Sequence, residues 1–129
     1  MIDHLGMPVR DIARATEFYL KALAPLGIGI MMEVSAEQTG AGAAVGFGTE
    51  GKPFFWIGEA ATLGGGHLHV AFAASSRAAV DAFYAAAIAA GARDNGPPGL
   101  RPQYHANYYA AFVLDAGGNN IEAVCHAPA

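Results

Sequence analysis

The chain has 129 residues, of which 53% are hydrophobic and 14% are charged, and its formal net charge is −4. Disordered chains are poor in apolar residues and rich in charge, so this composition excludes a disordered protein. None of the apolar stretches approaches the roughly 18 residues of a membrane-spanning helix, and the basic residues are scattered rather than gathered into a nucleic-acid-binding patch. The length is that of one domain, residues 1–129.

The first part of the chain, residues 1–60, predicts one helix and four strands. A short apolar segment over residues 2–9 is typical of a strand. The apolar residues that follow recur at spacings of three and four, which indicates a helix with one buried face; they are Ile12, Ala15, Tyr19, Ala22, Leu23 and Leu26. Asp11 is suited to cap this helix and Gly27 to end it. Further strands are expected over 28–35, 42–48 and 53–58.

The second part, residues 65–129, predicts the same order of elements. A strand is expected over 67–74, and a helix follows whose apolar face contains Val80, Phe83, Ala87 and Ile88. Ser75 or Ser76 is suited to cap that helix, and Gly91 to end it. Three strands then follow over 93–95, 108–115 and 119–126, the last two joined by a hairpin turn at 116–118.

The two parts are an internal repeat. At an offset of 65, His4 coincides with His69, and Phe18-Tyr19 coincides with Phe83-Tyr84. Neither repeat has enough core to be stable alone, so we expect the two to pack together about a pseudo-twofold axis. The prediction is an α+β fold of tandem βαβββ modules, in which His4 and His69 lie on equivalent first strands and face one shared concavity.

Glu122 is the acidic residue most in need of a partner, because it lies within the apolar strand sequence NNIEAVCH. Two histidines and a carboxylate that converge from separate strands match the facial triad of divalent-metal sites. The residues His4, His69 and Glu122 would suit Fe(II), Mn(II), Ni(II), Co(II) or Zn(II). The repeat places Trp56 or Ile57 where the first module would have its counterpart of Glu122, so the predicted site has three protein ligands.

Three segments carry a resemblance to a known family: DHLGMPVRD with ATEFYLKAL, GHLHVAFAA with AVDAFYAAAIAAGA, and FVLDAGGNNIEAV. The chain resembles the vicinal oxygen chelate superfamily, which includes glyoxalase I, bleomycin-resistance proteins, fosfomycin-resistance enzymes and extradiol dioxygenases. The stretch RPQYHANYYAAFVLD is similar to a subgroup described as lactoylglutathione-lyase-like. The resemblance implies a cupped eight-stranded mixed sheet with two main helices on its outside, and a homodimer.

The resemblance also implies metal ligands at His4, His69 and Glu122. The fourth ligand of glyoxalase I would fall at Trp56 or Ile57, neither of which binds a metal, and this departure argues against glyoxalase I activity. The remaining set of two histidines and one glutamate is similar to the triad of extradiol dioxygenases. Without the resemblance, the alternative for His4 and His69 is a pair of strand-edge histidines hydrogen-bonded to backbone, and for Glu122 a pairing with an arginine or a hydroxyl.

Residues 95–107 form a loop rich in proline and glycine, and such loops often carry binding groups. We predict Arg101 and Tyr104 to bind substrate, and His105, Tyr108 and Glu122 to act as catalytic groups; the alternative is an ordinary surface loop. Two further substrate-binding candidates lie outside this loop. Trp56 would form an apolar pocket wall suited to an aromatic ligand, and His67 shares a strand face with His69 or lies at the strand mouth.

The sequence therefore predicts a divalent-metal-dependent lyase, isomerase or dioxygenase that acts on a small, oxygen-chelating substrate. The alternative is a metal-free protein of the bleomycin-resistance type that binds or sequesters a small molecule, and a third possibility is an inert relative.

The start MIDHLGMPVRD has no basic segment followed by an apolar one, and Cys125 has no second cysteine to pair with. We therefore expect a cytoplasmic protein. Gly64-Gly65-Gly66 lacks the lysine of a phosphate loop and is interpreted as a connector.

Overall fold

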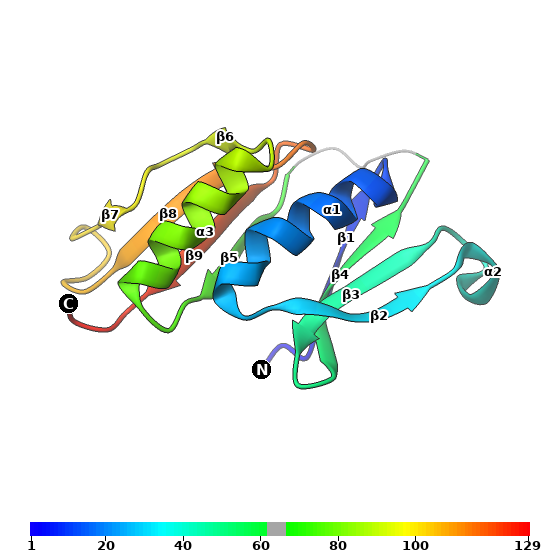
Figure 1. Ribbon diagram of the computed structural model, residues 1–129, viewed down its shortest axis with the longest axis horizontal. Coiled ribbons are helices and arrows are strands. Elements are labelled where there is room, and N and C mark those ends of the chain that lie inside the picture. Colours follow the sequence, from blue (N-terminus) through cyan, green and yellow to red (C-terminus); the bar gives the residue numbers. More distant parts are fainter. Residues whose placement is uncertain (62–66) are drawn as a thin grey trace. The chain divides into compact units, whose positions relative to one another are not determined.

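A computed structural model of the chain describes residues 1–61 and 67–129 (Figure 1). The predicted connector at residues 64–66 lies outside the described residues. The chain divides into two compact units. Unit 1 comprises Met1–Leu20 and Gly27–Gly66, and unit 2 comprises Lys21–Leu26 and His67–Ala129. No helix in the described part of the chain is long and apolar enough to cross a membrane.

Unit 1 contains a four-stranded mixed sheet in the order β1-β4-β3-β2. Its strands are β1 (Leu5–Val9), β2 (Gly29–Val34), β3 (Ala44–Thr49) and β4 (Lys52–Glu59). Between β1 and β2 the chain forms helix α1 (Ile12–Leu23) and the 3₁₀ turn η1 (Ala24–Leu26), and between β2 and β3 the short helix α2 (Ala36–Thr39). β1 pairs with β4 in parallel, and the other pairs are antiparallel.

Unit 2 repeats this arrangement with its own mixed sheet, in the order β5-β9-β8-β6, and β7 also pairs with β8. The strands are β5 (His69–Ala73), β6 (Arg93–Asp94), β7 (Gly99–Leu100), β8 (Tyr109–Leu114) and β9 (Asn120–Cys125). Helix α3 (Arg77–Ala89) follows β5 and packs against β8 and β9. β5 and β9 are parallel, while β8 and β9 form the predicted antiparallel hairpin.

The predicted α+β class and the two βαβββ modules are confirmed. The described residues form two mixed sheets, one in each unit, and the single cupped sheet of eight strands stays a prediction. The first strand begins at Leu5 rather than at residue 2. Two elements were not predicted. One is β7, and the other is α2, which begins at a capping box made by Ser35 and Gln38.

The predicted helix boundaries follow local backbone chemistry. Asp11 Oδ1 accepts the Arg14 N–H at 3.0 Å and caps α1, and of the two candidate serines it is Ser76 that caps α3. After α1 the chain tightens into η1, which contains Pro25, and then turns at Gly27, where φ is +77°. Glycine adopts this left-handed conformation at little cost, so it ends the helical segment.

The core of each unit lies between its sheet and a helix. In unit 1, Tyr19 of α1 packs its ring against Phe47 and Phe55, and all three side chains are fully buried. In unit 2, Val80, Phe83 and Ala87 of α3 are buried. The face of the sheet beneath α3 carries two small residues that are inaccessible to solvent, Ala111 and Ala123, which pair with each other on β8 and β9. These two alanines allow the helix to approach the sheet closely.

Candidate functional site

Glu122 lies in the middle of the sheet of unit 2. Its strand, β9, runs between β5 and β8, and the register places Ala71 and Phe112 on either side of Glu122. The side chain is only 1% exposed. A carboxylate in this position loses its hydration, so it is stable only if hydrogen-bond donors or a cation replace the water.

Two side chains supply those donors. Nε2 of His69 lies 2.8 Å from Glu122 Oε1, and the hydroxyl of Tyr108 donates to Oε2 at 2.5 Å. Both carboxylate oxygens are therefore engaged. The side chain of His69 is 54% exposed, so the buried carboxylate orients an imidazole that solvent and ligands can reach. The structure thus brings together three of the residues that the sequence singled out.

A hydrogen-bonded turn holds β5 in place beside β9. The buried carboxylate of Asp115 accepts from the backbone of Gly117 and from both the backbone and the amide side chain of Asn119. The Asn119 side-chain oxygen in turn accepts the N–H of Leu68 at 3.0 Å, directly before His69. This turn is the Asp-Ala-Gly-Gly-Asn segment of the sequence, and its fixed geometry sets where His69 meets Glu122.

His67 lies against the same turn. Gly118 has φ of +83°, and a Cβ atom at this position would lie 2.7 Å from Cε1 of His67. The imidazole of His67 therefore packs on the bare backbone of Gly118. His67 lies two residues before His69, where β5 begins. A substrate contact by His67 stays a prediction.

Tyr108 is held by the rings around it. Tyr104, His105 and His126 each make an edge-to-face contact with its ring, at centroid distances of 4.9, 5.5 and 5.2 Å. Burial, and then the hydrogen bond to Glu122, raises the pKa of Tyr108 to about 12. The hydroxyl is therefore protonated at neutral pH and acts as a donor toward Glu122 rather than as a base.

His105 and His126 form a second pair of imidazoles. Nε2 of His105 lies 2.6 Å from Nδ1 of His126, and the rings are stacked. Because Nδ1 of His105 accepts the Asn107 N–H at 3.1 Å, the hydrogen of a neutral His105 belongs on Nε2, where it donates to His126. His126 was not singled out from the sequence. The pairing of Tyr109 with Cys125 brings it beside Tyr108, and that register is not encoded locally.

Arg101 contacts its own loop and a ring on β8. Its two terminal guanidinium nitrogens donate to the carbonyl oxygens of Gly99 and Pro97, each at 2.8 Å, and the group lies 5.3 Å from the ring centroid of Phe112. The ring of Phe112 contacts that of His69. Arg101 therefore organises the loop above the sheet. Tyr104, at the edge of the rings around Tyr108, is 61% exposed. Substrate contacts by Arg101 and by Tyr104 stay predictions.

In unit 1, His4 directly precedes β1 and is exposed. Its Nδ1 lies 2.8 Å from Asp3 Oδ1, while the other oxygen of Asp3 accepts from Lys52 Nζ at 2.9 Å. The hydrogen bond to His4, and then that to Lys52, lowers the pKa of Asp3. With Nδ1 held by a carboxylate, Nε2 is the nitrogen of His4 that is suited to a metal. Neither Asp3 nor Lys52 was predicted to take part.

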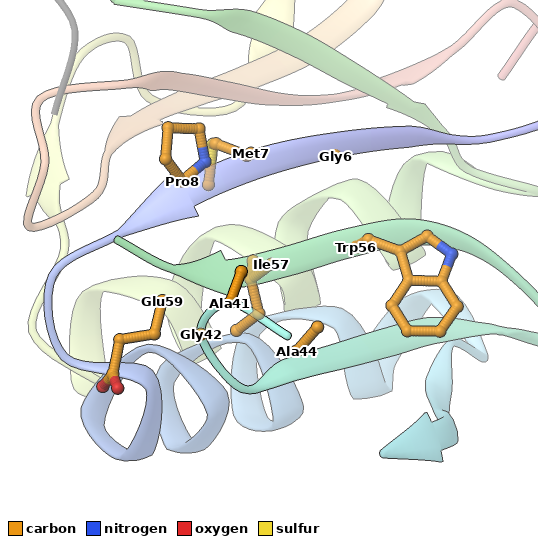
Figure 2. Close-up of a pocket in the computed structure, with 10 residues that line it drawn as sticks. Gly6, Met7, Pro8, Ala41, Gly42, Ala44, Trp56, Ile57 and Glu59 are labelled. Atoms are coloured by element: carbon orange, nitrogen blue, oxygen red, sulfur yellow. The ribbon is translucent and has the colours of Figure 1, made fainter. Parts of the chain in front are cut away.

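Strand register decides which residue of unit 1 corresponds to Glu122. Gly6 of β1 pairs with Trp56, and the repeat offset carries Gly6 onto Ala71, which pairs with Glu122. Trp56 is therefore the counterpart of Glu122, and Ile57 points into the core, where it is fully buried. The tryptophan borders an open pocket of about 320 Å³ on the face of the sheet away from the core (Figure 2).

The donor set of unit 2 fits a divalent metal ion. A carboxylate and an imidazole already lie within 2.8 Å of each other, and both are preferred ligands of Fe, Mn, Ni, Co and Zn. No group of three His, Cys, Asp or Glu side chains gathers within the described residues of either unit. His4 belongs to unit 1, whereas His69 and Glu122 belong to unit 2. The complete three-ligand set therefore stays a prediction.

Comparison with known proteins identifies relatives. A sequence model of the Glyoxalase/Bleomycin resistance protein/Dioxygenase superfamily matches residues 1–123. None of the curated proteins matches the chain. Among solved structures, the chain is similar to a glyoxalase/bleomycin resistance protein from Albidiferax ferrireducens T118. The two are 29% identical, with a TM-score of 0.77 over 97% of this chain and 98% of that one.

Two structures with named activities share the fold at lower identity. The fosfomycin resistance protein FosX from Listeria monocytogenes, solved as a mutant with Mn(II) and 1S,2S-dihydroxypropylphosphonic acid, is 18% identical, with a TM-score of 0.67 over 96% of this chain and 88% of that one. A glyoxalase I mutant from Zea mays is 20% identical, with a TM-score of 0.71, and the alignment covers 95% of this chain but 46% of that one. At these identities the likeness shows the fold alone.

Proposed function

Because the chain belongs to the Glyoxalase/Bleomycin resistance protein/Dioxygenase superfamily, we propose that it is a divalent-metal-dependent enzyme. The reaction is that of a lyase, an isomerase or a dioxygenase, and the substrate is a small molecule with two chelating oxygens. The observation that carries the proposal is the fully buried carboxylate of Glu122 in contact with the accessible imidazole of His69. A buried carboxylate is costly, and metal binding is the chemistry that best accounts for keeping it.

In this proposal His69, Glu122 and His4 hold the ion. When bound, the ion would act as a Lewis acid that stabilises negative charge on substrate oxygens. Tyr108 fixes Glu122 by donating to Oε2, which leaves Oε1 directed toward His69. Asp3 holds Nδ1 of His4 and thereby turns Nε2 toward a ligand. FosX was solved with Mn(II), which supports a metal in this fold.

Proton transfer is assigned to the imidazole pair of His105 and His126. Tyr108 is protonated at neutral pH, so its role in the proposal is that of a hydrogen-bond donor. When Nδ1 of His105 takes up a proton, Nε2 can pass its own hydrogen to Nδ1 of His126 over 2.6 Å, so that His105 is neutral again and His126 becomes the imidazolium. The pair is exposed, so it can exchange that proton with solvent or with a substrate group.

A metal-free binding protein is the second candidate, and two observations favour it. Trp56 stands at the position that corresponds to Glu122, so unit 1 offers an aromatic surface in place of a ligand. Both oxygens of Glu122 already accept hydrogen bonds from the protein. In this alternative the same groups bind a small molecule without turnover. The Trp56 position also argues against glyoxalase I activity in either case.

The two candidates differ in metal content. Protein purified without chelator should contain a stoichiometric divalent ion, and His4→Ala, His69→Ala and Glu122→Gln should each lose it. Glu33→Gln is the control, because it removes an exposed strand carboxylate and should retain the ion. If the wild type binds none of Fe, Mn, Ni, Co or Zn, the metal-dependent enzyme is wrong. If a metal does bind, turnover of a hemithioacetal or of a catechol by the metal-loaded protein identifies the reaction type.

We further propose that the protein works as a cytoplasmic homodimer. The composition and the lone cysteine support the compartment, and the family resemblance supports the dimer. The outer strands of the sheet in unit 1 are β1 and β2, and an unpaired strand edge offers backbone groups to which a second chain can bind. Light scattering of the purified protein tests this, and a monomeric mass at working concentration would contradict it.

A further inference from the structure

The sheet of unit 1 has a strip of small residues on the face away from its core. Gly58 of β4 lies at the centre of this strip, between its cross-strand neighbours Pro8 on β1 and Ala44 on β3. The flanking residue Ile57 points to the opposite face and is buried in the core. A Cβ atom at Gly58 would have no heavy atom within 4 Å, so the space above this residue is open.

Trp56 forms the wall at one end of this strip. Its cross-strand neighbours are also glycines, Gly6 on β1 and Gly46 on β3. A Cβ atom at Gly46 would lie 2.9 Å from the indole atoms Cε2 and Cζ2 and 2.8 Å from Cβ of Pro53. The indole therefore lies directly over the backbone of Gly46, and the lack of a side chain there gives the ring room in this orientation.

The charges around the pocket exclude a cationic anchor. Glu59 is the only charged residue among the described lining residues, and it lies at the end of the pocket away from Trp56 (Figure 2). Its carboxylate accepts the N–H of Ile12 at the start of α1, at 3.3 Å, so it is committed to the helix terminus. No cationic side chain is among the described lining residues, so an anionic group in this pocket would have no charge partner there.

These features define the chemistry of an occupant. A floor of small residues around Gly58 beside an aromatic wall accepts a planar ring, since planar groups stack on indole faces or edges. The volume of about 320 Å³ is at the lower end of the range for ligand pockets, which fits one ring or two fused rings. The lack of a cation favours an uncharged ring over a phosphonate, a phosphate or a carboxylate.

We propose that this pocket is a subsite for an uncharged planar ring, which lies on the strip at Gly58 and stacks against Trp56. The proposal deepens the proposed function and rests on it in one respect, because the ring would belong to the same substrate as the two chelating oxygens. The subsite itself needs no metal. It can therefore be tested on metal-depleted protein, so that its failure and the failure of the metal site are separate results.

The test uses Trp56 as its own reporter, because it is the only tryptophan and gives a single indole N–H signal in a ¹H–¹⁵N spectrum. The probes share one skeleton: 2-naphthol is planar and uncharged, 2-naphthyl phosphate is anionic, and decahydro-2-naphthol is not planar. We expect 2-naphthol to shift the indole signal saturably. The two other probes should bind about tenfold more weakly or not at all. Equal binding of all three probes, or no saturable shift with 2-naphthol, would overturn the proposal.

A Cβ atom at Gly58 would meet no heavy atom within 4 Å, so we expect Gly58→Val to fill the strip and to abolish the 2-naphthol shift. Gly29→Val is the matched control, because it adds the same side chain on β2, outside the pocket, and should bind like the wild type. Trp56→Leu provides a second, independent variant, and its loss of binding is measured by ligand-observed NMR. Retention of wild-type binding by either Gly58→Val or Trp56→Leu refutes the subsite.

Discussion

The hydrogen bond from Tyr108 to Glu122 leads to the most direct test of the site. Tyr108→Phe removes only the hydroxyl and leaves Oε2 of a carboxylate that is 1% exposed without this donor. A hydrogen bond to a charged group contributes about 1.5–3 kcal/mol, and an unsatisfied buried acceptor costs the same order. Tyr108 itself is half-buried, which allows water some access. We therefore expect Tyr108→Phe to lower the free energy of unfolding by about 2 kcal/mol.

Urea denaturation of a double-mutant cycle measures this coupling. The cycle combines Tyr108→Phe with Glu122→Met, which replaces the carboxylate by an apolar chain of similar length. We expect a coupling energy of about 1–3 kcal/mol between the two positions. Tyr104→Phe is the control, because its exposed ring packs on Tyr108 and its loss of a hydroxyl should change the stability by less than about 0.5 kcal/mol. If Tyr108→Phe costs no more than Tyr104→Phe, or if the coupling is zero, Glu122 does not depend on this donor.

Three further predictions concern pH, backbone conformation and the core. The pKa of Tyr108 is raised from 10.0 to about 12, so the contribution of its protonated hydroxyl to stability is complete below pH 10 and is lost as the pH rises through about 12. In urea titrations, the difference in unfolding free energy between the wild type and Tyr108→Phe should therefore shrink over that pH range. Gly118→Ala should lower the unfolding free energy by about 1–2 kcal/mol, and a His67→Ala background should relieve part of this loss, since it removes the clash but not the strain at positive φ. Phe55→Ala should cost about 3–5 kcal/mol in urea denaturation, while Phe54→Ala, which is only partly buried, should cost less.

Local patterns were enough to predict most elements. The spacing of apolar residues gave α1 and α3, because a helix buries every third or fourth side chain against its sheet. The caps Asp11 and Ser76 were predictable because an N-cap bonds to a backbone N–H only three residues away. The same kind of local signal marks α2, where Ser35 and Gln38 form a capping box that could have been recognised.

Other features depended on partners distant in sequence. β7 has two residues and exists only through its pairing with β8, so no periodicity could reveal it. The choice between Trp56 and Ile57 was open because one extra residue in a turn changes the face on which every later side chain lies. The pairing of β1 with β4 settles it in favour of Trp56. The hydrogen bonds from Arg101 to two carbonyl oxygens of its loop were likewise not predictable, and its role in substrate binding stays a prediction.

The sequence by itself determined the α+β modules, the repeat, and the acid that most needs a partner. It singled out Glu122, because a carboxylate among apolar strand residues is costly wherever the strand lies. It singled out His69 because the repeat aligns this residue with His4. Only the tertiary structure decided how that cost is met. Strand register brings Tyr108 to the second oxygen of Glu122 and sets His126 beside His105, and the register depends on side-chain packing across the whole sheet rather than on any neighbouring residue.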